Sequence, residues 1–168
     1  MAVTADAVKK LRDLSGAGVM DCKKALDETS GDVEKAVKVL REKGIASAEK
    51  KSGRETGQGL VDSYIHAGGR IGVLVEVNCE TDFVARTEEF KRLVHDIALQ
   101  IAGIPTTLVI SEDQLPPDAE GTPEETVLLK QTFLKDSSRT IEQLVKEAIV
   151  QTGENIRIRR FTRFELGQ

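Results

Sequence analysis

Asp82 and Phe83 are neighbouring residues whose types and position suit a chemical role. They lie in the segment Val77–Arg86 (VNCETDFVAR), where an alternating apolar pattern gives way to a helical one. Side chains at such a junction can project beyond the packed core, so Asp82 could approach a magnesium site or a cationic group while Phe83 enters an apolar slot on a partner. The alternative is that Phe83 fills this protein's own core and Asp82 caps a helical turn.

The other residues with reactive side chains are isolated. Cys22 and Cys79 lack the paired spacing of a zinc site or the density of a disulfide scaffold, so we expect small buried thiols. His66 and His95 have no neighbouring carboxylate and nucleophile at a suitable spacing. No glycine-rich phosphate loop or dinucleotide fingerprint is present. We therefore expect no enzymatic reaction, no bound metal and no cofactor.

Composition favours a soluble protein with a protein partner. Of the 168 residues, 39% are hydrophobic, and 24 basic and 28 acidic residues give a net charge of −4, which argues against a direct nucleic-acid partner. The start of the chain lacks the pattern of a signal peptide, and no stretch is long enough for a membrane span. We expect a cytoplasmic protein that does not associate with membranes.

The first part of the chain has three helical patterns. Thr4 and Asp32 are the expected N-caps of the first and third helices, and Gly44 is the expected end of the third. The stripe of the first helix is Val8, Leu11 and Leu14. We expect a three-helix domain over residues 1–44, followed by a linker, partly helical at most, over residues 45–58.

Residues 59–168 change to a mixed pattern. Alternating segments over residues 60–66 and 70–78 predict a β-hairpin, and Thr87 begins an amphipathic helix that Gly103 closes. Residues 104–125 read as an extended crossing or loop. A last helix begins after Thr140, which forms a capping box with Gln143, and Gly153 ends it.

The final segment, residues 155–164, reads as a closing strand. Alternation places Ile156, Ile158 and Phe164 on one face and Phe161 on the other. The predicted fold class is α+β: a three-helix domain, a linker, and a core with a three-stranded antiparallel sheet covered by helices.

Two long motifs resemble the elongation factor Ts family. They are Leu11–Leu26 (LRDLSGAGVMDCKKAL) and the segment Val77–Arg86. Phe133–Asp136 and Arg160–Glu165 resemble the family's carboxy-terminal helix and closing strand. Longer family members carry further helical sequence before the Phe133 segment, and many have a second copy of the core, so this chain resembles a short, single-core form.

The resemblance implies a guanine-nucleotide exchange factor for elongation factor Tu. It binds the GTPase domain of the partner in the GDP-bound and nucleotide-free states and promotes GDP release by disturbing the magnesium and phosphate site. The matching segment for magnesium dislocation is Thr81, Asp82, Phe83 and Val84. The resemblance also implies a ubiquitin-associated-like fold for the three helices. The residues expected to bind the partner are Arg12, Val19, Met20, Asp21, Lys23, Asn78 and Cys79.

Other interpretations stay open from the sequence. The three-helix domain could be a non-catalytic interaction adaptor. Arginines 157, 159, 160 and 163 could serve a ribosome- or RNA-associated factor, although a short basic strand in an acidic chain is more often a solvated sheet face. Because the second copy of the core is missing, a homodimer through the sheet could give a two-plus-two complex with elongation factor Tu.

Overall fold

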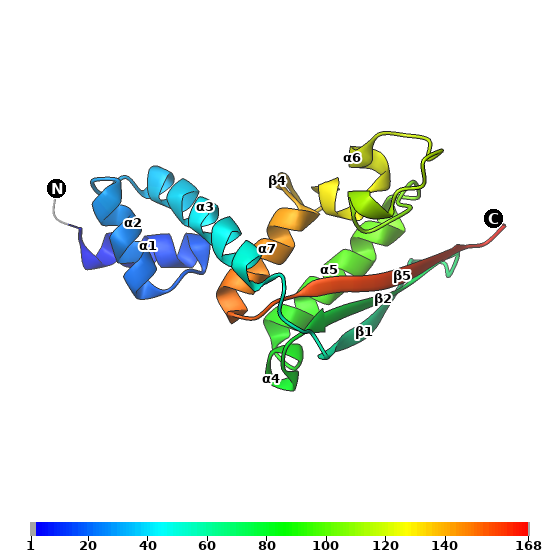
Figure 1. The fold of residues 1–168 in the computed structure, drawn as a ribbon, viewed down its shortest axis with the longest axis horizontal. Helices are drawn as coiled ribbons and strands as arrows, with labels where there is room; N and C mark the ends of the chain where they lie inside the picture. Colours follow the sequence, from blue (N-terminus) through cyan, green and yellow to red (C-terminus); the bar gives the residue numbers. More distant parts are fainter. Residues whose placement is uncertain (1–2, 168) are drawn as a thin grey trace.

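The computed structural model describes residues 3–167, so the expected domain limits at residues 1 and 168 lie outside it. The molecule is elongated, with helices α1 and α2 at one end and the end of strand β5 at the other (Figure 1). The longer helices are α1 (Ala5–Ser15), α2 (Val19–Glu28), α3 (Val33–Lys51), α5 (Glu88–Gly103) and α7 (Ile141–Thr152). The short helical turns are α4 (Asp82–Ala85), α6 (Pro123–Thr126), η1 (Glu112–Gln114) and η2 (Leu128–Lys130).

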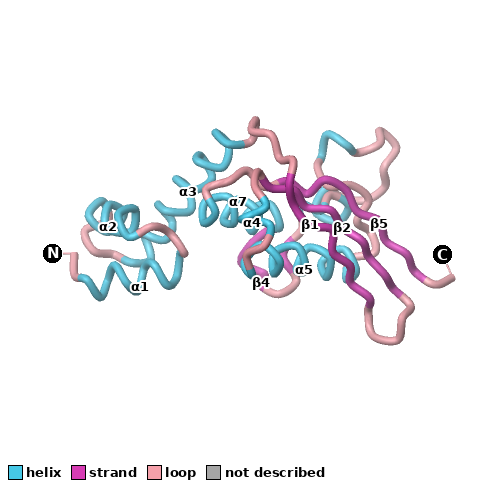
Figure 2. Tube along the Cα trace, turned by 90° about the horizontal axis from the view of Figure 1, so that it is seen from below, coloured by secondary structure: helices cyan, strands magenta, loops and turns pink. Residues whose placement is uncertain are grey.

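The strands form two separate sheets. The larger sheet is antiparallel and has the order β1-β2-β5, so the α+β prediction with a three-stranded antiparallel sheet is confirmed (Figure 2). Its strands are β1 (Gln58–Ile65), β2 (Ile71–Cys79) and β5 (Arg157–Glu165). A small hairpin is formed by β3 (Thr132–Phe133) and β4 (Asp136–Thr140). The segment Phe133–Asp136 was expected in a helix, and this expectation is wrong because these residues form the turn of that hairpin.

Helix α5 covers one face of the large sheet. The hydroxyl of Thr87 accepts a hydrogen bond from Phe90 N and caps the helix as predicted. The apolar side of α5 packs on alternate residues of β2, and α7 closes the same core. The buried residues on the sheet side are Val73, Val75, Val77 and Cys79.

Helix α3 contributes to two apolar cores. Its first half supplies Ala36 and Leu40 to a cluster shared with α1 and α2, and its second half supplies Ala48 to the sheet core. Gly44 does not end this helix, contrary to the prediction. It lies inside α3 and faces α7, where a Cβ atom would come 3.0 Å from a methyl group of Val150. The glycine therefore serves close helix packing instead of termination, and residues 45–51 of the expected linker are helical.

A β-bulge changes the faces of β5. Glu76 pairs with Arg160 and Val77 with Ile158, so Arg159 is an extra residue in the strand. Phe161 consequently packs on the same core as Ile158, while Phe164 lies on the outer face and is 72% exposed. The strict alternation predicted from the sequence is wrong for Phe161 and Phe164.

Candidate functional site

The junction after β2 is a tight turn that leads into α4. Thr81 has an extended backbone (φ −125°, ψ 156°), and its hydroxyl accepts a hydrogen bond from Val84 N at 3.4 Å, so Thr81 is the N-cap of this single turn. Asp82 is the first helical residue. Its carboxylate pairs with the guanidinium of Arg86 at 2.8 Å, one turn later. Asp82 is therefore not the cap that the alternative interpretation assumed.

Phe83 projects away from the protein. Its side chain is 81% exposed, whereas Val84 packs on the sheet core and Ala85 is buried. The interpretation of Phe83 as a filler of this protein's own core is therefore wrong. An aromatic ring this exposed on an ordered turn is a feature typical of a contact that a partner completes.

The carboxylates of Glu154 and Glu80 form the hydrogen bonds that fix the turn. Glu154 accepts hydrogen bonds from Glu80 N at 3.1 Å, from Thr81 N at 3.0 Å and from the Thr81 hydroxyl at 2.5 Å. Glu80 in turn accepts a hydrogen bond from Asn155 N at 2.6 Å. Sequence reasoning missed these residues because the contacts join positions more than seventy residues apart; the local signal was only that a carboxylate and an amide follow the helix-ending Gly153.

Cys79 lies under the turn and supports it without being reactive. The thiol is buried and donates a hydrogen bond to the carbonyl oxygen of Thr81 at 3.1 Å. Burial, assisted by the negative charge of Glu154, raises the pKa of the Cys79 thiol to about 11. Cys22 is buried in the helical cluster, so the expectation of two buried thiols is confirmed. The Asn78 side chain lies against the sheet and not under the turn, because its amide donates to the carbonyl oxygen of Gln58 and to the carboxylate of Glu76.

The second group of expected residues forms an exposed face on the helical end of the molecule. Val19 and Met20 begin α2, and Met20 is 64% exposed. Leu14 is also exposed, although the helical spacing predicted it in the stripe with the buried Leu11, and it lines a hollow beside α3 and α7. Three charged residues of the motif are also exposed: Arg12, Asp21 and Lys23. The consecutive residues Val19 and Met20 are together called the helical face below.

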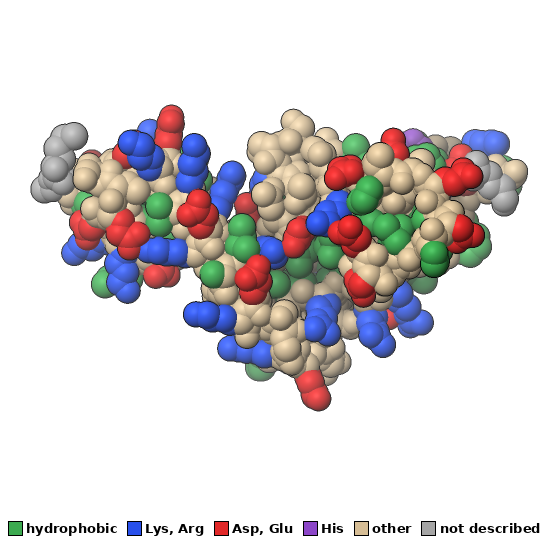
Figure 3. Space-filling view, turned by 45° about the horizontal axis from the view of Figure 1, so that its top comes forward, with side chains coloured by type: hydrophobic (Ala, Val, Ile, Leu, Met, Phe, Trp, Pro, Cys, Tyr) green, Lys and Arg blue, Asp and Glu red, His purple; other side chains and the backbone are tan. Residues whose placement is uncertain are grey.

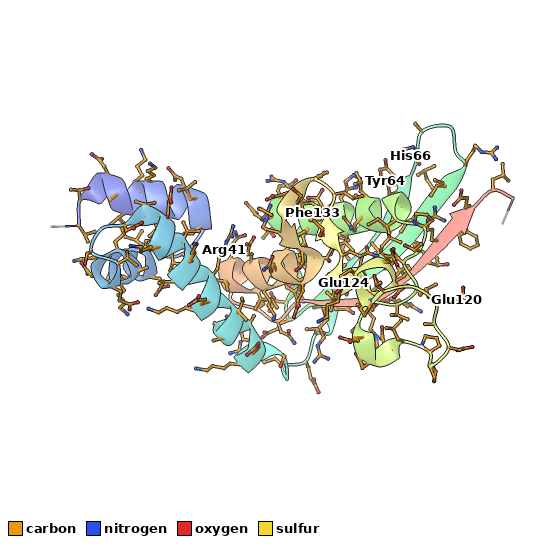
Figure 4. All side chains as sticks on the ribbon, turned by 90° about the horizontal axis from the view of Figure 1, so that it is seen from above. Arg41, Tyr64, His66, Glu120, Glu124 and Phe133 are labelled. Carbon is orange, nitrogen blue, oxygen red and sulfur yellow. The ribbon has the colours of Figure 1, made fainter. Side chains whose placement is uncertain are left out.

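The helical face and the turn belong to different parts of the fold. Figure 1 shows α1 and α2 on one side of α3 and α7, and α4 at the end of the sheet on the other side. A hollow of about 380 Å³ lies between α3 and α7. Arg41 of α3, which is labelled in Figure 4, is one of the residues that line it. Two arginines of its lining share one carboxylate, because Glu147 pairs with Arg139 at 2.7 Å and with Arg41 at 3.9 Å.

The basic residues of β5 mostly bind groups of this protein. Arg160 pairs with Glu76 at 2.7 Å, Arg163 pairs with Glu165 at 2.7 Å, and Arg157 donates to the carbonyl of Ser52. In Figure 3 side chains of both charges are present on the visible face. The pairing of Arg157, Arg160 and Arg163 within the chain disfavours β5 as a basic strip for a phosphate backbone.

The described residues contain neither a candidate metal centre nor a helix that could cross a membrane. Within residues 3–167, no cluster of three or more His, Cys, Asp or Glu side chains is arranged to hold a metal ion. None of the helices in this range combines the length and the apolar character that crossing a membrane needs.

Comparison with known proteins agrees with the motifs. A family model described as Elongation factor TS matches residues 80–168. A protein named Elongation factor Ts from Cyanothece sp. is 54% identical over 196 aligned positions, which cover 99% of this chain and 74% of the relative. The protein of the same name from Thermosynechococcus vestitus is 53% identical, covering 99% of this chain and 66% of the relative. That from Prochlorococcus marinus is 49% identical, covering 99% and 90%.

These alignments also show a difference in length. They extend over 196 positions, whereas this chain has 168 residues, so the relatives contain residues without a counterpart here. Identity near one half over almost all of the chain, together with the family model, leads to one assignment: the chain belongs to the elongation factor Ts family, whose members are translation elongation factors.

Proposed function

We propose that this protein is a guanine-nucleotide exchange factor that binds elongation factor Tu with GDP and promotes GDP release. The observation that carries the proposal is the exposed ring of Phe83 on a turn fixed by hydrogen bonds on its inner side. Family membership supports the identity of the partner. The protein catalyses no change of covalent bonds in this role, and its place of action is the cytoplasm, where its partner works.

The mechanism follows from differential affinity. A factor accelerates release by stabilising the nucleotide-free form of the partner more than the GDP-bound form. Phe83 enters an apolar slot of the GTPase domain, and Asp82 approaches the magnesium and phosphate site. Thr81 and Val84 hold these two side chains at the end of the sheet, since one caps the turn and the other anchors it in the core.

The helical face supplies the second contact. Val19 and Met20 are exposed apolar side chains next to the charged residues Arg12, Asp21 and Lys23, a composition suited to a protein partner. In this proposal the ubiquitin-associated-like three-helix domain docks the GTPase domain, the continuous helix α3 connects it to the core, and the core acts on the nucleotide site. Asn78 and Cys79 were expected to bind the partner, but in this proposal they support the sheet and the turn, because Cys79 is buried and the Asn78 amide binds Gln58 and Glu76.

The uncovered face of the sheet favours a homodimer. On this face Gly72 of β2 pairs with Ile65 of β1 and with Phe164 of β5, and Leu74 lies two residues further along β2. The apolar side chains of Ile65, Leu74 and Phe164 are exposed. The sheet therefore offers an apolar surface opposite α5, and a second copy of the chain covers it in our proposal. Two copies, each with one partner, give a two-plus-two complex.

The deciding experiment measures release of fluorescent GDP from elongation factor Tu by stopped flow, with increasing amounts of this protein. Acceleration that saturates with concentration is the expected result. Binding to elongation factor Tu without acceleration would instead indicate an interaction adaptor, and salt-sensitive binding to RNA would indicate an RNA-associated factor.

A further inference from the structure

Three segments that are distant in sequence meet at one set of polar residues. Glu80 follows β2, while Glu154 and Asn155 lie between α7 and β5; we call these three residues the junction cluster. The third segment is the chain just after α3, at residues 52–54, which the cluster also contacts. The cluster therefore lies where the helical part, the turn and the sheet join.

Glu154 is placed by the end of α7. Gly153 has a positive φ of 76° and ends the helix, so the chain reverses and brings the next side chain under the turn. The backbone N–H groups of Glu80 and Thr81 lie beyond the last paired residue of β2 and before the first helical residue, so neither structure supplies them with a partner. One oxygen of Glu154 accepts both N–H groups, and the other accepts the Thr81 hydroxyl.

Glu80 and Asn155 continue the connection to α3. The Glu80 carboxylate accepts from Asn155 N and lies 3.4 Å from the guanidinium of Arg54. The Asn155 side chain is buried, and its amide donates to the carbonyl oxygens of Ser52 at 3.3 Å and Arg54 at 2.8 Å. The turn and the end of α3 are thus bound to the same two consecutive residues.

We propose that Glu154 is the positioning residue of nucleotide exchange: it fixes the turn that presents Phe83, and Glu80 and Asn155 hold this turn in register with α3. The inference rests on the proposed function and deepens it. Glu154 acts through Thr81 and not through the partner, so its loss leaves docking by the helical face intact and lowers the rate at which the bound complex releases GDP. Misplacement of a reacting group by about 1 Å can lower a rate by about a hundredfold.

The first test compares variants in the GDP release experiment. Glu154→Ala removes all three acceptor contacts, Glu154→Gln keeps the shape and one acceptor oxygen, and Glu142→Gln removes a charge from the exposed side of the same helix, where it pairs only with Lys146. We expect the maximal release rate of Glu154→Ala to fall about tenfold with a half-saturating concentration within about threefold of the wild type. Glu154→Gln should lie between wild type and Glu154→Ala, and Glu142→Gln should match the wild type.

The second test needs no partner and separates the two proposals. Amide hydrogen exchange of Glu80 and Thr81 should become faster in Glu154→Ala and should be intermediate in Glu154→Gln, which keeps one acceptor oxygen, while exchange in the middle of β2 stays as in the wild type. If the wild-type protein does not accelerate GDP release, the proposed function fails, and the exchange of these amides still decides whether Glu154 fixes the turn.

Three results would overturn the positioning role. One is an unchanged exchange rate of the Glu80 and Thr81 amides in both Glu154 variants. Another is faster exchange with an undiminished maximal release rate. The third is a loss that appears only in the half-saturating concentration, which would make Glu154 part of the docking surface. Should Glu154→Ala fail to fold, Glu154→Leu, which fills a similar volume but has no acceptor oxygen, carries the same comparison.

Discussion

Phe83 and Val84 are neighbours that face opposite sides of the same helical turn: Phe83 is 81% exposed, and Val84 packs on the sheet core. This arrangement separates the function of the turn from its stability. Replacement of Phe83 by a smaller residue removes an exposed ring, whereas replacement of Val84 removes packing against the sheet core.

Phe83→Ala is expected to abolish most of the stimulated GDP release and to leave the fold unchanged. Truncation of an aromatic anchor in a partner pocket typically costs about 2 kcal/mol or more, which corresponds to a loss of about thirtyfold. Stopped-flow release and thermal unfolding check the two parts. Leu108→Ala is the control, since this apolar side chain is also exposed but lies in the loop after α5, away from the turn and from the outer sheet face. Undiminished release by a folded Phe83→Ala protein would remove the ring from the mechanism.

Met20→Ala is expected to weaken docking without slowing the bound complex. Its side chain is 64% exposed on the helical face, so truncation removes apolar contact with the partner and costs about 1 kcal/mol in affinity. The half-saturating concentration should rise about fivefold while the maximal rate is retained. Leu108→Ala, at an exposed site in the loop after α5, should change neither value. A lower maximal rate with unchanged half-saturation would assign Met20 to the exchange step.

Leu74→Glu is expected to convert a dimer into a monomer. Leu74 lies on the outer sheet face, and two copies packed there would bury like charges without partners. Light scattering after size-exclusion chromatography at micromolar concentration should give twice the chain mass for the wild type and for Leu108→Glu. A wild-type protein that is strictly monomeric under these conditions would contradict the homodimer.

The buried thiol of Cys79 makes stability depend on pH in alkaline solution. Its pKa is about 11 in the fold and 9.0 without perturbation, so the fold favours the neutral thiol. This contribution is complete below about pH 9 and is lost as pH rises toward about pH 11, because the unfolded chain ionises first. Urea unfolding at about pH 8 and about pH 10 should show a loss of about 1 kcal/mol that Cys79→Ala does not show. Equal pH dependence in both proteins would assign the loss to other groups.

The sequence allowed prediction of features that depend on local patterns. Thr4, Asp32, Thr87 and Thr140 cap helices as expected, because an N-cap bonds to a backbone group two or three residues away. The exposed state of Phe83 was only one of two interpretations, since spacing does not tell which way a ring on a junction points. Family resemblance, and not periodicity, favoured the functional interpretation.

The features that the sequence did not reveal depend on distant contacts. The bulge at Arg159 exists because β5 pairs with β2, and no local pattern marks the extra residue. Gly44 was predicted to end its helix because glycine is common at helix ends. The close approach of Val150, which explains the glycine, involves another helix and leaves no local pattern in the sequence. The sequence led to no prediction for Glu154, because its contacts with Glu80 and Thr81 join positions more than seventy residues apart.

Helix α3 sets limits on how the length of this protein can vary. It has 19 residues and a length of about 28 Å, and its two halves pack in different cores. One inserted residue would rotate one half against the other by about 100° and would turn an apolar stripe toward water. Length differences among relatives should therefore fall in the irregular segment after α5. The interval between Asp32 and Ser52 should stay constant, because α3 fixes the distance between the helical face and the turn that carries Phe83.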